Sequence, residues 1–190
     1  MRNQVVSPTH VSRTTKHFNK WESCTQCPLH AHRHSLVHFR GQIPAEVLFI
    51  GDHPEKADDR LSKPLLGVVG DLFDEILSKS MSRVGKFRFC ITNTVCCLPS
   101  TPDTTELRPP VVTEIDSCRT RLIDFISLVS PKLIITMGGL VHKHVNVSLP
   151  TYNIKHVKDI LRESDRTRDM TIKKTELEIC RELERVRANG

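Results

Sequence analysis

The sequence has no long apolar run. None of its stretches approaches the ~18 consecutive apolar residues that a membrane-spanning helix needs. Its first sixteen residues, MRNQVVSPTHVSRTTK, also lack the apolar core of a signal peptide. We therefore expect an intracellular, cytoplasmic protein without a membrane partner.

Internal repeats and long low-complexity segments are missing as well, and the composition is that of a folded chain. The 190 residues are 38% hydrophobic and 26% charged, which is typical of a globular protein of one domain. The polar, basic start predicts a loose arm over residues 1–20, followed by a single domain over residues 21–190. We expect this domain to act as a monomer.

The charge balance is basic. With 28 Lys and Arg residues against 22 Asp and Glu residues, the net charge is +6. This excess favours an anionic partner, and nucleic acid comes first among them. Charge alone does not identify the partner, because many basic proteins bind nothing charged.

Short apolar runs alternate with helical patterns along the chain. Buried strands are predicted at residues 45–52 (AEVLFIGD), 88–95 (RFCITNTV) and 131–139 (PKLIITMGG). Apolar residues at helical spacing predict helices over residues 68–81, 111–129 and 171–186. Such alternation predicts an α/β fold with a mainly parallel sheet that helices cover on both sides.

Ligands in such sheets bind at the carboxyl ends of the strands. Asp52, Asn93 and Gly138 follow or end the three predicted strands. We therefore expect them to lie along one rim of the sheet.

The cysteines do not suit a disulfide framework, because there are seven of them and the expected compartment is reducing. Cys24 and Cys27 have the two-residue gap with which two thiolates reach one metal centre. Redox dithiols share this gap, although the pair lacks a thioredoxin-like setting. Cys97 follows a predicted strand. Cys118 lies on an apolar helix face, where core packing is the alternative.

Several motifs occur in order between Cys24 and Gly138. They are CTQCPL at 24–29, GDHPEKADD at 51–59, KPLLGVVG at 63–70, ITNTVCC at 91–97, and Arg108, Pro110, Glu114 and Cys118. Their order and spacing resemble those of family 4 uracil-DNA glycosylases, the iron–sulfur type. The resemblance implies a three-layer α/β/α sandwich around a central, mostly parallel four-stranded sheet.

The resemblance also implies a 4Fe-4S iron–sulfur cluster. Its ligands would be Cys24, Cys27, Cys97 and Cys118. Cys96 stands where the family has a lysine, so Cys97 is the better ligand candidate. The cluster would tie the N-terminal segment to a strand end and a helix.

The activity that the resemblance implies is hydrolysis of the N-glycosidic bond of uracil or a modified pyrimidine flipped out of DNA. Asp52 replaces the family's acidic residue, which positions water and stabilises the positive sugar. Without the resemblance, a helix cap is the alternative for Asp52. Asn93 matches the family asparagine that binds the base, since an amide offers both donors and an acceptor.

Three departures from the family pattern affect the pocket. Leu65 replaces the phenylalanine that stacks on the base, a contact worth ~1–3 kcal/mol per base, and remains the base-binding candidate there. His53 replaces a small residue beside Pro54 and becomes a catalytic candidate that narrows the pocket or adds a contact. The late Tyr-His-Pro motif appears as YNIKH at 152–156. Either Asn153, at the base, or His156, as a catalytic group, takes the histidine's place.

These departures support a rival hypothesis, in which the chain is a catalytically impaired iron–sulfur module that binds DNA or a protein partner. A third possibility is the same scaffold reused for another ligand. Basic residues near the expected rim would contact phosphates in the first two hypotheses, or form a solvated helix face. They are Lys155, Lys158, Arg162, Arg166 and Arg168.

Overall fold

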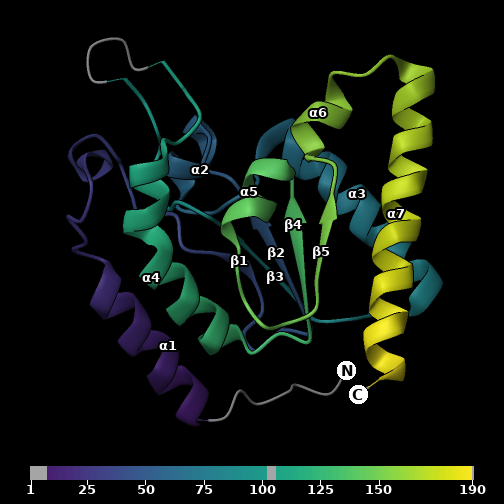
Figure 1. Cartoon of the computed structure of the whole chain (residues 1–190), viewed down its shortest axis with the longest axis horizontal. Helices are drawn as coiled ribbons and strands as arrows, with labels where there is room; N and C mark the ends of the chain where they lie inside the picture. The colour runs from purple at the N-terminus through teal and green to yellow at the C-terminus, as the bar shows by residue number, and fades with distance from the viewer. Residues whose placement is uncertain (1–7, 102–105, 190) are drawn as a thin grey trace.

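A five-stranded sheet forms the centre of the protein, in a computed structural model that describes residues 8–101 and 106–189 (Figure 1). Its strands follow the order β1-β3-β2-β4-β5. They are β1 (Arg40–Gly41), β2 (Val47–Gly51), β3 (Phe89–Asn93), β4 (Leu133–Met137) and β5 (Thr151–Ile154). Strands β2 to β5 run parallel, and β1 pairs antiparallel with β3.

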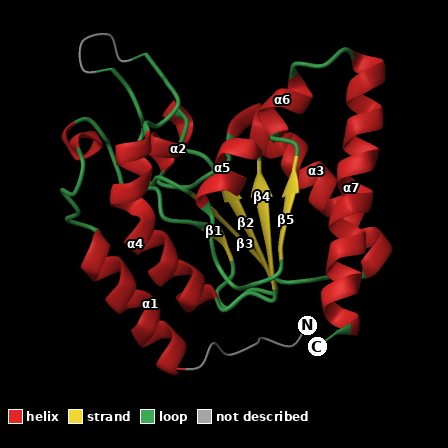
Figure 2. Ribbon diagram, viewed as in Figure 1, coloured by secondary structure: helices red, strands yellow, loops and turns green. Residues whose placement is uncertain are grey.

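Helices cover both faces of this sheet (Figure 2). They are α1 (Pro8–Trp21), the 3-10 helix η1 (Pro28–Ala31), α2 (Lys56–Leu61), α3 (Gly67–Val84), α4 (Val112–Val129), α5 (Gly139–His144), α6 (Val157–Leu161) and α7 (Asp165–Ala188). Side chains of α3, α6 and α7 pack on one face, and those of α4 and α5 pack on the other. The fold is therefore the expected three-layer α/β/α sandwich.

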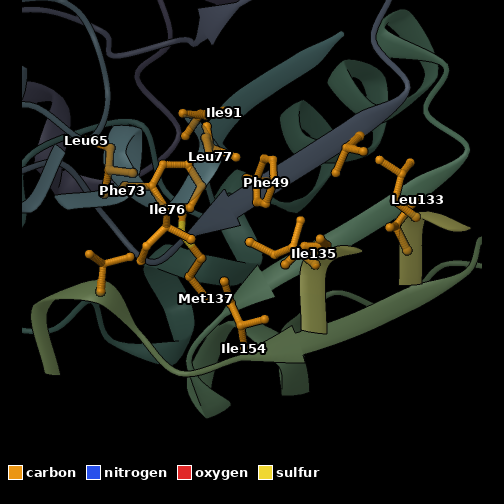
Figure 3. Close-up of a cluster of buried hydrophobic side chains, with 14 of the residues drawn as sticks. Phe49, Leu65, Phe73, Ile76, Leu77, Ile91, Leu133, Ile135, Met137 and Ile154 are labelled. Atoms are coloured by element: carbon orange, nitrogen blue, oxygen red, sulfur yellow. The ribbon is translucent and has the colours of Figure 1, made fainter. Parts of the chain in front are cut away.

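Alternating side chains of the central strand feed both halves of the core. Val47 and Phe49 of β2 belong to the cluster under α3 and α7, whereas Leu48 and Ile50 belong to the cluster under α4. All four are fully buried. Figure 3 shows the first cluster, in which the Phe49 and Phe73 rings meet edge to face with centroids 5.0 Å apart. A strand buried on both faces explains why this run is continuously apolar.

The three predicted strands are confirmed as β2, β3 and β4, and the predicted helices as α3, α4 and α7. The sheet has five strands rather than four, because two residues of β1 pair with β3 at its edge. A two-residue strand carries no apolar periodicity, so no pattern in the sequence predicts it. Helix α7 begins at Asp165, six residues before the predicted start, since its first turns are polar.

The prediction of a loose arm is wrong for residues 8–20, which belong to helix α1. His17 and Trp21 of this helix are buried, and α1 packs against α4. Residues 1–7 lie outside the described part of the chain, and the domain boundary at residue 21 stays a prediction. Among the described helices, none combines the length and the apolar character needed to cross a membrane.

Candidate active site and metal centre

Five cysteines from three segments line one small cavity, among them the four predicted cluster ligands. These four are Cys24, Cys27, Cys97 and Cys118. The first two lie between α1 and the start of η1, the third follows β3, and the fourth lies on α4. All seven cysteines of the chain are free thiols, and Cys96 also lines this cavity, which we call the thiol cavity.

Local backbone structure presents the first two thiols from one turn. The Cys24 N–H donates to the Trp21 carbonyl at 3.0 Å, which turns the chain as soon as α1 ends. Cys27 is extended and caps η1, where Pro28 occupies the first helical position. Proline suits that position because its missing N–H would have no helical partner. The turn therefore fixes both cysteines beside the end of α1.

Burial raises the pKa of two of the thiols that line this cavity. It raises the pKa of Cys27, and it raises the pKa of Cys97 to about 11 despite a hydrogen bond from Arg33. That bond runs from Arg33 Nη1 to Cys97 Sγ over 3.3 Å. Thiolates are the form that binds metals, so metal loading here must displace protons.

Two unpartnered donors support an anionic guest in the thiol cavity. Trp21 Nε1 and Arg121 Nε are buried and have no hydrogen-bond partner among the described residues. Both side chains line the cavity. Leaving a buried donor unsatisfied costs about 1–3 kcal/mol, whereas sulfur atoms of an iron–sulfur cluster would accept these bonds. Four cysteine thiols are also the usual ligands of such a cluster, so the residues fit it.

The structure does not indicate a site for a single metal ion among the described residues. Within the described ranges, no three His, Cys, Asp or Glu side chains are grouped as ligands of one metal ion.

A second site lies at the carboxyl ends of the strands, near α5 and α6 (Figure 1). Asp52 follows β2, and His156 lies between β5 and α6. Both line a cleft together with His53, Lys158 and other residues. The Asp52 carboxylate lies between the two histidines, with Oδ1 3.3 Å from His156 Nε2 and Oδ2 3.5 Å from His53 Nε2.

Backbone contacts set the hydrogen positions on the two rings. His156 Nδ1 accepts from the Lys158 backbone N–H at 3.1 Å, so the neutral ring carries its proton on Nε2 and donates to Asp52. His53 Nδ1 donates to the Pro54 carbonyl at 3.0 Å. Its Nε2 is therefore free to accept when neutral, and it faces Asp52 as a cation when protonated. The two histidines thus differ in what they offer the carboxylate.

Asp52 is an anion throughout the physiological range. Burial raises the pKa of this carboxyl, but the hydrogen bond from His156 and the electrostatic interactions with His53 and His156 outweigh burial, with a further hydrogen bond from the His53 backbone. The net result lowers the pKa to about 2. Asp52 is therefore suited to stabilising positive charge and orienting water, and not to donating a proton.

Asn93 ends β3 beside Gly51, its register partner in β2. The side chain is buried, and its Nδ2 has no hydrogen-bond partner among the described residues. A Cβ at position 51 would lie 2.6 Å from Asn93 Oδ1, so only glycine leaves room for this amide. A buried, unpartnered amide donor next to the strand ends suits a carbonyl oxygen of a ligand.

Asn153 and His156, the two alternatives for the histidine of the late motif, occupy different positions. In the orientation that satisfies its neighbours, the Asn153 amide nitrogen lies 3.0 Å from both Thr136 Oγ1 and the Gly138 carbonyl oxygen. It thus binds β4 and its following turn, whereas His156 contacts Asp52. Leu65 is 9% exposed and packs with Phe73 in the core (Figure 3). None of the three base-binding candidates, Leu65, Asn93 and Asn153, belongs to the lining of the cleft.

The basic residues expected at the rim have acidic neighbours in several cases. Lys158 pairs with Glu55, Lys155 with Glu163, and Arg162 with Asp159. Arg168 pairs with Asp165 in addition. Of the five, Lys158 and Arg162 line the cleft.

Sequence reasoning missed two arginines of the thiol cavity, Arg33 and Arg121. Arg121 had a usable signal. It lies three residues after Cys118 on α4, and residues at this spacing share a helix face. An arginine that shares an otherwise apolar helix face with a ligand candidate indicates a buried, functional side chain.

A sequence profile described as the Uracil DNA glycosylase superfamily matches residues 38–177. The chain belongs to this superfamily. Its sheet, its cleft at the strand ends and the order of its motifs agree with that membership.

Individual relatives within the superfamily carry a common name. A type-4 uracil-DNA glycosylase of Pyrobaculum aerophilum is 33% identical over 117 residues, which is 62% of this chain and 56% of that protein. The type-4 uracil-DNA glycosylase of Thermotoga maritima is 31% identical over 118 residues, 62% of this chain and 58% of that protein. A third, from Saccharolobus solfataricus, is 35% identical over 117 residues, with shares of 60% and 50%. The matches thus span only about half the length of these curated relatives.

Proposed function

We propose that this superfamily member is a DNA glycosylase that hydrolyses the bond between deoxyribose and uracil or a modified pyrimidine. One observation carries the proposal. Asp52 is held as an anion between His53 and His156 at the strand ends, with the unpartnered amide of Asn93 at the end of the adjacent strand. The names of the relatives support the same substrate class.

The chemistry needs stabilisation of two opposite charges. As the N-glycosidic bond breaks, its electron pair leaves with the base, and positive charge develops on the sugar. The Asp52 anion stabilises that positive charge and orients the water whose oxygen forms the new bond to C1′, and the proton that this water loses neutralises the departing base anion. The His156 Nε2–H holds Oδ1 of the carboxylate, which leaves its orientation fixed before the substrate binds.

Base recognition is the role that we propose for Asn93. Its free Nδ2 donors suit a carbonyl oxygen of the flipped pyrimidine, where negative charge accumulates as the base departs. His53 is proposed as a catalytic residue beside Asp52, because its ring lies 3.5 Å from the carboxylate and helps to lower the pKa of Asp52. Asn153 and Leu65 are less suited to touching a base, because both are engaged in the fold.

We further propose that Cys24, Cys27, Cys97 and Cys118 hold a 4Fe-4S cluster. When bound, it supplies structural cohesion and not bond-breaking chemistry, because the thiol cavity and the cleft are separate sites without a shared cysteine. The cysteines themselves join the α1–η1 turn, the segment after β3 and helix α4. This arrangement favours a role in holding the end of β3, which carries Asn93.

A panel of oligonucleotides tests the activity. The iron-loaded protein is incubated with single- and double-stranded DNA that contains uracil, other modified pyrimidines or only normal bases. We expect abasic sites in at least one modified substrate and none in the normal one. Absence of base release from every substrate, by protein with a full complement of iron, would defeat the proposal.

A DNA-binding module without catalysis is the second candidate. The described residues of the cleft lining include no Phe, Tyr or Trp for stacking a base, and Lys158 is paired with Glu55 at its side. For such a module, DNA would bind without base release, and an Asp52→Ala variant would bind as well as the wild type. The same oligonucleotide panel, read by a binding assay, separates the two candidates.

A further inference from the structure

Arg121 is a buried arginine whose bonds all go to neutral oxygen atoms among the described residues. Its side chain is 2% exposed on α4. Nη1 donates to Thr92 Oγ1 at 3.2 Å, and Nη2 donates to the carbonyls of Asn93 at 2.6 Å and Thr94 at 3.1 Å. Nε has no partner within the described part of the chain. Among the described residues, no carboxylate pairs with this guanidinium.

A buried charge of this kind needs an anion nearby, because desolvation of an uncompensated ion costs several kcal/mol. The acid one turn further along α4, Asp124, pairs instead with Lys20 at 2.6 Å. His17 and His38 lie beside this region, where burial, followed by the charge of Arg121, lowers their pKa values to about 4 and about 3. Both rings are thus neutral, and neither competes with Arg121 as the local cation.

The thiol cavity is the place where a bound anion would compensate the charge of Arg121. Arg121 lines it together with the four cysteines, and it follows Cys118 by three residues on the same helix. An iron–sulfur cluster held by four thiolates is anionic, and hydrogen bonds to its sulfurs set its potential. Arg33 already donates to Cys97 Sγ from another side. The free Nε–H of Arg121 offers a second such donor.

The tip of the Arg121 side chain contacts the backbone of Asn93, the base-binding candidate. Nη2 holds the carbonyls of two successive residues, Asn93 and Thr94, at the end of β3. The Asn93 side chain is fitted tightly over Gly51, so a small shift of this backbone would displace its amide. One guanidinium thus touches both the thiol cavity and the strand end that carries Asn93.

We propose that Arg121 is a positioning residue, which supplies the buried positive charge for the anionic cluster and fixes the backbone of Asn93. The inference rests on the proposed function, because it assumes that the four cysteines hold the cluster. It assigns to one side chain the link between cluster and base recognition.

Variants of Arg121 in the iron-loaded protein test this link. Arg121→Met removes the charge and the fork of donors, and Arg121→Lys keeps the charge without the fork. Arg119→Met is the control, because Arg119 is exposed on the same helix and pairs with Asp116. The readouts are the rate of iron loss to a chelator, the reduction potential by spectroelectrochemical titration, and the kinetics of base release.

For Arg121→Met we expect iron loss to become roughly 10–100-fold faster, the range typical of lost outer-shell partners. The potential should shift to more negative values, since a positive charge next to the cluster favours its reduced form. Arg121→Lys should restore the potential but not base release, because one ammonium cannot hold two carbonyls in the geometry of the fork. Arg119→Met should behave as the wild type in all three measurements.

The outcomes separate this inference from the proposed function. A wild-type protein that takes up no iron would defeat the proposed cluster itself. A loaded wild type, with an Arg121→Met variant of unchanged potential and unchanged iron loss, would overturn only the inference. If Arg121→Met does not fold, Arg121→Lys decides the matter: wild-type kinetics of base release in that variant would contradict the positioning role.

Discussion

The thiol cavity and the cleft at the strand ends are built on different principles. The cavity gathers cysteines from segments some ninety positions apart, between Cys24 and Cys118, and leaves buried N–H donors without partners. The cleft includes residues that directly follow strands, such as Asp52 and Gly138, and Asp52 already has its partners in His53 and His156. The cavity thus has donors that suit a bound group, whereas the carboxylate of the cleft already has its partners within the protein. The two should therefore respond differently to substitution.

The largest effect is expected from Asp52→Asn. The change removes the anion and keeps the side-chain volume, so we expect base release to slow by roughly 10²–10³-fold, as for loss of one preorganised charge-stabilising group. Iron content should not change, because Asp52 does not line the thiol cavity. Single-turnover base release and iron analysis on the same sample measure both. Loss of iron in this variant would show that the two sites are not independent.

Replacing a cavity cysteine should act first on iron content and stability. In Cys118→Ser we expect loss of iron and a fall in Tm of more than ~5 °C, since each 1 kcal/mol lowers the Tm of a chain of this size by ~2–4 °C. Cys96→Ser is the matched variant, because Cys96 lines the cavity but is not a proposed ligand. It should retain iron. Loss of iron in Cys96→Ser with retention in Cys97→Ser would exchange their roles.

The close approach between Gly51 and Asn93 predicts a third effect. A methyl group in Gly51→Ala would lie 2.6 Å from Asn93 Oδ1, so the amide must shift. Overpacking of this kind destabilises a protein by about 1–3 kcal/mol, and base release should weaken with it. Gly139→Ala is the control for stability, because a Cβ there meets nothing within 4 Å. Equal Tm values for the two variants would contradict the tight fit.

Acid should distinguish the cleft from the rest of the protein. The pKa of Asp52 is about 2 in the folded protein and lower than its ordinary value, so its contribution to stability is present above the ordinary value. That contribution is lost as the pH falls through the folded pKa. The difference in unfolding free energy between wild type and Asp52→Asn should therefore shrink between about pH 4 and pH 2. Denaturant unfolding at several pH values measures it, and a constant difference would refute the low pKa.

The sequence predicted the layers of the fold because they depend on continuous or periodic apolar residues. Strands β2, β3 and β4 are buried runs, and α3 and α4 carry apolar stripes. Helix α1 was missed because its composition is polar and basic, although His17 and Trp21 bury one face of it. Local periodicity does not report such tertiary packing.

The candidate site was predictable to a similar, limited extent. Motif spacing brought forward Asp52, Asn93 and the cysteines, since these lie at strand ends or in short turns. It left Asn153 and His156 as alternatives, because the choice depends on how the chain turns from β5 into α6. There His156 caps the helix, and its Nε2 reaches Asp52. Arg121 belongs to the same class of residue, since its role depends on contacts with a strand distant in sequence.

The smallest effect is expected at the edge of the cleft, from Glu55→Gln. Glu55 pairs with Lys158, and both side chains are partly exposed, so the pair contributes only about 0–1 kcal/mol to stability. Its loss frees a lysine that lines the cleft. Each additional phosphate contact steepens the dependence of log K on log salt by ~0.9 for duplex DNA. We therefore expect tighter DNA binding at low salt with a slope steeper by about that amount.

Glu75→Gln is the control for this change, because it breaks an exposed pair with Lys79 on α3, away from the cleft lining. Its DNA binding should match the wild type at every salt concentration. If Glu55→Gln also matches the wild type, Lys158 does not meet phosphate, and the cleft receives DNA without it. If it binds more tightly and releases base more slowly, the Glu55–Lys158 pair holds α6 and His156 in place for Asp52. The position of His156 in the cleft would then depend on an ion pair at the rim, just as we propose that the position of Asn93 depends on Arg121.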